Sequence, residues 1–126
     1  MITIDGFEQL TQQQIFDMAV EHIGNTKQKS ICGKGCVYSG SGCNAAPLLK
    51  PEYHRTADAT GSWQDLVESK LVPKTNFLFI DELQSAHDDS YNDESFMRTW
   101  YYKMFNLAEI YKLDTTKINA LPINKQ

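Results

Sequence analysis

The sequence predicts a single, mainly α-helical domain in which three or four helices surround a glycine-rich central segment. Two observations point to helices: a capping motif followed by apolar residues near the N-terminus, and a long aromatic and aliphatic stripe in the last third. A third is the concentration of glycine, cysteine and proline in residues 36–49. A small α+β domain stays open, because that segment also suits a short strand or hairpin.

The first helix is expected to begin after Thr11. The Thr11 side chain can accept the amide of Gln14 while the Gln14 side chain reaches back, which forms a capping box. Apolar residues then recur at three-four spacing, and Gly24 with Asn25 is typical of a left-handed helix end. The expected buried face contains Ile15, Met18, Ala19, His22 and Ile23.

Three further helices are expected in the second half of the chain. Ser62 and Asp65 form a second capping box, which predicts a short helix. Residues 75–88 suit a helix or, at their start, a buried strand, and the continuing three-four spacing favours a helix. Asn92 or Asp93 should cap the longest helix, with acids in its first turn. Its inward stripe contains Phe96, Trp100, Met104, Leu107, Ala108 and Tyr111, which leaves Tyr102 outside the stripe.

The domain is expected to cover residues 1–113, followed by a C-terminal tail at 114–126 without apolar periodicity. A chain of 126 residues that is 41% hydrophobic has enough apolar material for one core. Residues 26–35 and 52–61 are polar or punctuated by glycine, so both are expected to be surface loops.

Composition excludes several classes of protein. The net charge is −4 and no basic block is present, so duplex nucleic acid is not an expected partner. The N-terminus does not resemble a secretory signal, and no window approaches the ~20 apolar residues that span a bilayer. A cytoplasmic protein without membrane contact is therefore expected. In a reducing compartment the three cysteines, Cys32, Cys36 and Cys43, should be free thiols.

One constellation would suit a cysteine-dependent hydrolase or transferase. Cys43 precedes an apolar run, and His87 with Asp88 follows, in the order nucleophile, base and orienting acid. This order only permits catalysis, because a cysteine and a histidine occur together in most chains of this length. Adjacent helical residues point in different directions, so Asp88 should orient His87 poorly, and Asp58 or Asp65 are alternative third members.

Metal chemistry is less well supported. Four residues of types that bind zinc lie within 23 positions, but their spacing lacks the two close pairs of a structural zinc site. These residues are Cys32, Cys36, Cys43 and His54. The pair at 87–88 also resembles the metal-binding pair of HD-type phosphohydrolases, with His54 and Asp114 to complete it, but too little chain follows the pair. No metal or cofactor is expected, and His87 suits the last turn of a helix.

The glycine turn inside residues 36–49 is the favoured ligand site. Its amides, hydroxyls and a nearby cation could hold a small anionic, nucleotide-like molecule. The alternative is that the glycines serve only to turn the chain, and that structural interpretation is favoured. The candidate ligand-binding residues are Lys34, Tyr38, Ser39, Gly40, Ser41 and Gly42.

Three sequence motifs occur together: LTQQQIFDMAVEHI at 10–23, CVYSGSGCNAAP at 36–47 and LQSAHD at 83–88. With these motifs the chain resembles small proteins of tailed bacteriophages over residues 7–113, a likeness that brings no activity to transfer. The resemblance implies a phage protein in the cytoplasm of an infected bacterium. Small phage proteins outside the virion commonly neutralise host components. The resemblance therefore implies a non-enzymatic binder, in host takeover or anti-defence, that sequesters a host protein or a small nucleotide-like ligand. A homo-oligomer stays open.

Overall fold

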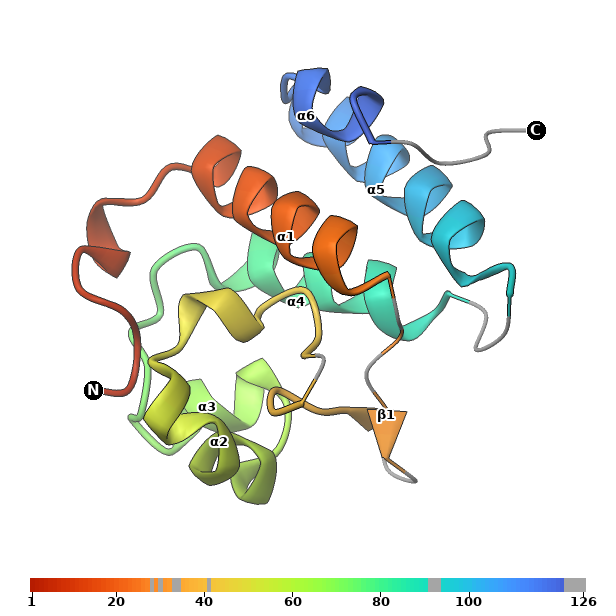
Figure 1. The fold of residues 1–126 in the computed structure, drawn as a ribbon. Coiled ribbons are helices and arrows are strands. Elements are labelled where there is room, and N and C mark those ends of the chain that lie inside the picture. The colour runs from red at the N-terminus through yellow and green to blue at the C-terminus, as the bar shows by residue number, and fades with distance from the viewer. Residues whose placement is uncertain (28, 30, 33–34, 41, 91–93, 122–126) are drawn as a thin grey trace.

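The computed structural model describes residues 1–27, 29, 31–32, 35–40, 42–90 and 94–121, with only the backbone described at 31–32 and 35–36. The fold is mainly α-helical, as predicted (Figure 1). No helix in this part of the chain is long and apolar enough to cross a membrane. The helices are α1 (Gln12–Thr26), α2 (His54–Thr60), α3 (Trp63–Glu68), α4 (Phe77–Asp88), α5 (Phe96–Tyr111) and α6 (Thr116–Asn119). The 3-10 turns are η1 (Phe7–Gln9), η2 (Ala46–Leu48) and η3 (Pro51–Tyr53).

Helix α1 begins with the predicted capping box. The Gln14 amide donates to Thr11 Oγ1 at 3.1 Å, and the Thr11 amide donates to Gln14 Oε1 at 2.9 Å. The predicted end at Gly24 is wrong, because the helix continues to Thr26 and the left-handed residue is Lys27, with φ 56°. A Cβ at Gly24 would lie 2.7 Å from Leu121 Cδ2. Gly24 therefore lets the C-terminal segment pack closely on α1.

Helices α2 and α3 pack against each other, and α3 also packs against α4. α3 opens with the predicted capping box of Ser62 and Asp65. α2 occupies residues predicted to be a loop at 52–61, so that prediction is wrong. The helix buries only Ala57, so it has no apolar periodicity that the sequence could reveal.

Helices α4 and α5 pack against each other, and α4 also packs against α3 and β2. The prediction of a helix rather than a strand is confirmed for residues 77–88. α5 begins at Phe96, with Ser95 before it and no acid in its first turn, so the predicted acidic start is wrong. The predicted caps, Asn92 and Asp93, lie outside the described residues.

Helix α6 packs against α1, although its residues were predicted to belong to a loose tail. Ile118 is fully buried, and Tyr101 Oη of α5 donates to Asn119 Oδ1 at 2.8 Å. Figure 1 shows α6 beside the end of α5. The residues from 114 to 121 are therefore part of the packed domain.

A short hairpin precedes the central segment. Strands β1 (Ile31–Cys32) and β2 (Gly35–Cys36) are antiparallel, and residue 31 pairs with residue 36. A hairpin was predicted within the central segment, whereas the strands occupy residues mostly assigned to the loop at 26–35. The loop prediction is therefore partly wrong, and the remaining central segment contains turns and η2.

The central segment passes between α1 and the α2–α3 pair (Figure 1). Buried side chains of this segment and of helices α1 to α6 form one hydrophobic core. η2 packs against α1, and the chain after it bridges to the N-terminus through an antiparallel pair at Thr3 and Leu49. The predicted α5 stripe is buried except for Tyr111, which is partly buried, and Tyr102 is 46% exposed as expected. The largest fully buried side chains include Trp63, Trp100, Tyr38, Phe16 and Phe79.

Candidate functional site

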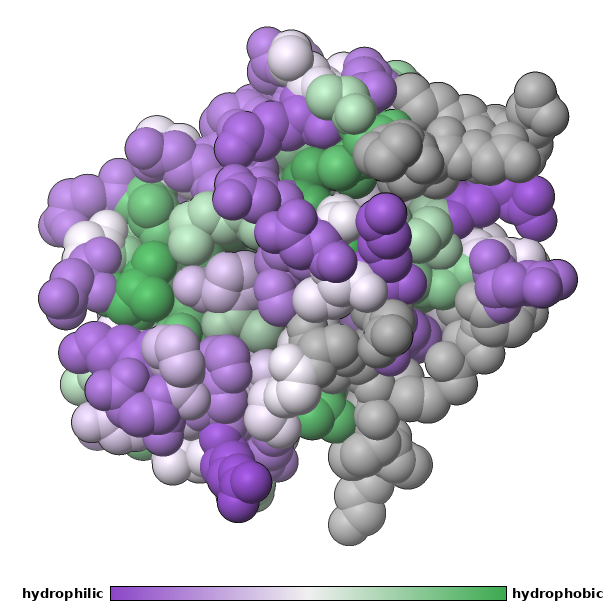
Figure 2. Space-filling model, in the orientation of Figure 1, coloured by the Kyte–Doolittle hydropathy of each residue, from purple (hydrophilic) through white to green (hydrophobic). Residues whose placement is uncertain are grey.

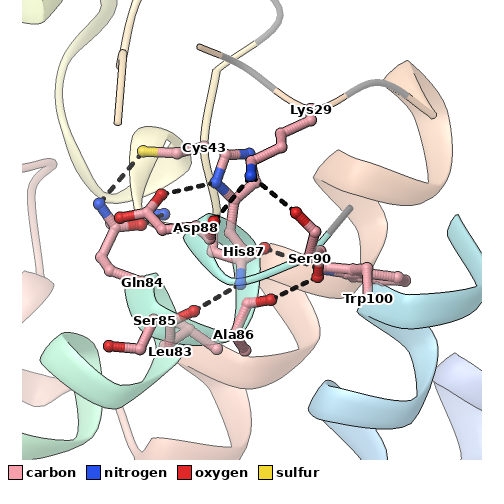
Figure 3. A network of polar contacts seen from close by, with 12 residues as sticks. Lys29, Cys43, Leu83, Gln84, Ser85, Ala86, His87, Asp88, Ser90 and Trp100 are labelled. Atoms are coloured by element: carbon pink, nitrogen blue, oxygen red, sulfur yellow. Dashed lines mark hydrogen bonds and ion pairs between the residues drawn. The ribbon is translucent and has the colours of Figure 1, made fainter. Parts of the chain in front are cut away.

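The candidate catalytic histidine and aspartate meet at the end of α4. His87 is fully buried, and its Nδ1 lies 2.9 Å from Asp88 Oδ1, where the carboxylate can accept the ring proton (Figure 3). The sequence argument that neighbouring residues point apart is therefore wrong for this pair. Asp88 is the last residue of α4, so its short side chain can turn back without meeting a following helical turn. The ring also lies edge-on to Phe96, at 5.7 Å.

A lysine holds the backbone just beyond this pair. Lys29 Nζ donates to the carbonyl oxygens of Asp88 and Ser90, both at 2.7 Å (Figure 3). Ser90 Oγ donates to the Ala86 carbonyl at 2.7 Å. A cation at the carboxyl end of a helix is favoured by the helix dipole. These contacts therefore fix the end of α4 and orient the 87–88 pair.

Cys43 is not a free thiol. Its sulfur is disulfide-bonded and fully buried, which corrects the expectation of three free cysteines. The partner side chain lies outside the described ones. Gln84 Nε2 of α4 donates to Cys43 Sγ at 3.2 Å (Figure 3). Gln84 Oε1 accepts the Ala45 amide at 2.9 Å. A disulfide sulfur offers no thiolate, so the candidate nucleophile is blocked in this state.

A buried asparagine that sequence reasoning missed ties the same segment to both long helices. Asn44 Nδ2 donates to the Leu83 carbonyl of α4 at 2.6 Å. Asn44 Oδ1 accepts Trp100 Nε1 of α5 at 3.0 Å. The only signal in the sequence is a polar residue inside an otherwise apolar run. Asn44 and Gln84 together hold the central segment against α4 and α5.

The glycine turn uses its donors on the chain itself. The Asp58 carboxylate accepts the Tyr38 amide at 2.6 Å and Ser39 Oγ at 2.5 Å. The Tyr38 hydroxyl donates to the Gly61 carbonyl at 3.2 Å, and burial, followed by the charge of Asp88, raises the pKa of Tyr38 above its usual value. Asp58 therefore stands where an anionic ligand of these donors would bind.

Both described glycines of the turn have a positive φ, 67° at Gly40 and 76° at Gly42, as the structural interpretation requires. A Cβ at Gly42 would lie 2.8 Å from His22 Nε2, whereas nothing lies within 4 Å at Gly40. His22 Nε2 is 3.2 Å from the Gly42 carbonyl oxygen. Two of the proposed ligand contacts, Lys34 and Ser41, lie outside the described residues.

The remaining acids and histidine proposed from sequence have local partners. His54 Nε2 lies 3.0 Å from the Ala46 carbonyl oxygen, and Asp65 belongs to the α3 capping box. The Asp114 carboxylate accepts the Thr116 amide at 2.7 Å. Hydrogen bonds from the side chain and the amide of Thr116 lower the pKa of Asp114. Among the described residues no group of three or more His, Cys, Asp or Glu side chains is placed to hold a metal ion.

The most exposed aliphatic side chains lie elsewhere, on α4 and α5. Leu78 and Ile110 are 70% and 73% exposed, and among large apolar side chains of the described part only Met1 is comparable. The face seen in Figure 2 is largely hydrophilic, with hydrophobic residues in separate small areas. Between α4 and α5 runs a groove of about 250 Å³, here called the α4–α5 groove. It is lined by Glu82, Ser85, Ala86 and Asp89 on one side and Lys103, Asn106, Leu107 and Ile110 on the other.

The comparisons with known proteins add no relative. The likeness to tailed-bacteriophage proteins therefore rests on the sequence motifs alone and stays a prediction. No family model, curated protein or solved structure matches this chain.

Proposed function

We propose that this chain is a non-enzymatic binding protein that sequesters a host protein in the cytoplasm of a phage-infected bacterium, for host takeover or anti-defence. The observation that supports binding is the exposure of Ile110, which lines the α4–α5 groove, and of Leu78, which precedes the groove residue Glu82 by one turn of α4. Large aliphatic side chains left in water favour association, because their burial against a partner releases free energy. The phage setting rests on the sequence resemblance.

A protein partner is favoured over a small nucleotide-like ligand. The donors of Tyr38 and Ser39 are already used by Asp58, within the chain. A phosphate there would have to displace a carboxylate and bear its repulsion. The glycine turn therefore serves the fold in the described structure.

An enzyme is the weaker alternative. Cys43 is buried and disulfide-bonded, so attack on a substrate would first require reduction of that bond. The contact between His87 and Asp88 resembles a base with its orienting acid, but it also fits a buried histidine at a helix end.

The test is recovery of the tagged full chain from infected and uninfected cells, followed by native mass spectrometry. Wild type should retain one host protein in a defined ratio, and the double variant Leu78→Ser with Ile110→Ser should lose it. Tyr53→Ser, at an exposed aromatic on η3, is the matched control and should keep the complex. Retention of no protein by wild type would contradict the proposal, and a retained nucleotide would favour the ligand alternative.

A further inference from the structure

The α4–α5 groove has an apolar end and a polar end. Leu78 precedes Glu82 by one helical turn, so both project from the same side of α4. Glu82 in turn lines the groove with Ile110. Leu107 and Ala86 are nearly buried beneath it. Ile110 therefore lines the groove itself. Leu78 extends the α4 face that lines the groove by one turn and lines a neighbouring hollow with Tyr111.

The α4 side of the groove is acidic. α4 contains Asp81, Glu82 and Asp88 and no lysine or arginine, and Asp89 follows directly. Asp88 is engaged with His87, but the other three acids are exposed. The α5 side supplies a single cation to the groove, Lys103. Positive charge placed along α4 by a partner would therefore be complementary to Glu82 and Asp89, the two acids that line the groove.

The dimensions suit a short helix. α4 has 12 residues, which corresponds to a length of about 18 Å at ~1.5 Å per residue. A helix of about three turns laid along α4 and α5 would present an apolar stripe at three-four spacing to Leu78 and Ile110. Basic residues beside that stripe would then face Glu82 and Asp89.

We propose that the α4–α5 groove receives a basic amphipathic helix of the host protein, with Leu78 and Ile110 as the apolar contacts and Glu82 and Asp89 as the charged ones. This inference rests on the proposed function and names the chemistry of the partner. A second copy of this chain fits less well, because a symmetric contact would bring two acidic α4 surfaces together.

The direct test is an NMR titration of the isotope-labelled full chain with a helical leucine–lysine peptide of about 14 residues. Amide shifts should be confined to α4 and α5, and affinity should fall as salt is raised. A leucine–glutamate peptide of the same pattern should bind at least about tenfold more weakly. Equal binding of both peptides, or shifts outside these helices, would overturn the inference.

Charge-reversal variants separate local from overall electrostatics. Glu82→Lys with Asp89→Lys should weaken the leucine–lysine peptide at least about tenfold. The control is Glu8→Lys with Glu52→Lys, which makes the same change in net charge at exposed acids outside α4 and α5. Its affinity for the peptide should stay within about twofold of wild type. An equal loss in both pairs would show that net charge alone attracts the peptide, which overturns the groove as the site.

The outcomes in cells distinguish this inference from the proposed function. If wild type retains a host protein and the Glu82→Lys, Asp89→Lys variant retains it equally, the groove inference falls and the binding function stands. If the peptide binds the groove but wild type retains no host protein, the binding function falls. A wild-type dimer in light scattering that Ile110→Ser dissociates would assign the groove to a second copy and overturn the inference.

Discussion

Single buried polar residues decide how the central segment sits on the helices. Asn44 satisfies a carbonyl of α4 and the indole of Trp100, and Gln84 satisfies the Ala45 amide. Each of these groups is buried, so loss of one partner leaves another without a hydrogen bond inside the protein. The segment therefore depends on two polar side chains as well as on its apolar residues.

Asn44→Ala should lower the free energy of unfolding by about 3 kcal/mol, because it leaves the Trp100 N–H and the Leu83 carbonyl without their partner. Urea denaturation followed by tryptophan fluorescence measures the change. Asn106→Ala, at an exposed position on α5, is the control and should change stability by less than about 0.5 kcal/mol. Equal effects would contradict the buried role of Asn44.

The two glycines of the turn offer a matched comparison. Gly40→Ala should lower the free energy of unfolding by about 1 kcal/mol, because its only penalty is a side chain at positive φ. Gly42→Ala has the same backbone penalty and also collides with His22 and Ala46, so it should cost about 3 kcal/mol. Thermal and urea unfolding would show the difference. If the two variants are equally stable, close packing at Gly42 is not the reason for that glycine.

At the scale of elements, the pairs α4–α5 and α1–α6 differ in how much of each helix is committed to the core. α5 buries a full stripe, whereas α6 relies on Ile118 and on a few polar contacts with α1 and α5. A short helix has little stability of its own, so its position depends on those contacts.

Ile118→Ala should therefore destabilise the protein by about 2–4 kcal/mol, because it removes the one buried side chain of α6. Ile110→Ala makes the same chemical change at a 73% exposed position and should have an effect within about 0.5 kcal/mol. Hydrogen exchange at α6 should accelerate only in the first variant. Unchanged exchange there would show that α6 is held by other contacts.

The contact between α4 and α5 can be followed by titration. A side-chain hydrogen bond to Glu82 raises the pKa of Tyr111 to about 12. The pKa of Tyr111 is higher in the folded than in the unfolded protein. The contact therefore contributes its full stabilisation of the fold below about pH 10, and this stabilisation is lost as pH rises through about 12. Glu82→Gln should lower the pKa of Tyr111, measured by absorbance at about 295 nm, whereas Asp81→Asn should not. Equal shifts would disprove the specific contact.

At the scale of the whole molecule, local signals predicted what local chemistry determines. The capping boxes at Thr11 and Ser62 and the α5 stripe identified helices correctly, because caps and apolar spacing depend only on residues close together in the sequence. α2 and α6 each bury a single residue, so they left no periodic pattern to find.

The candidate site depended on residues far apart in sequence. The disulfide at Cys43 and the use of Tyr38 and Ser39 by Asp58 arise from folding, so spacing alone could not reveal them. The contact of His87 with Asp88 depends on where α4 ends, which the sequence located without indicating the side-chain direction. The exposed pair at Leu78 and Ile110 became apparent only once α4 and α5 were placed together.

The disulfide gives a whole-molecule prediction. The chain has three cysteines, so the unfolded but unreduced protein should take up one alkyl group from iodoacetamide, and the reduced protein three. Reduction should lower the free energy of unfolding by about 3 kcal/mol. Mass spectrometry and urea denaturation measure both. Uptake of three groups without reduction would show that the bond is absent, and acid-quenched alkylation in infected cells would report its state there.

The docking of α6 on α1 also affects synthesis of the protein. α1 is made early, but part of its covering surface comes from α6 and from Leu121, which packs on Gly24. At about 5–20 residues per second, α1 waits roughly 5 to 20 s on the ribosome before that surface has been translated. The domain therefore completes its core only after Leu121 has been translated, and a chain that stops before α6 would expose part of α1 to aggregation.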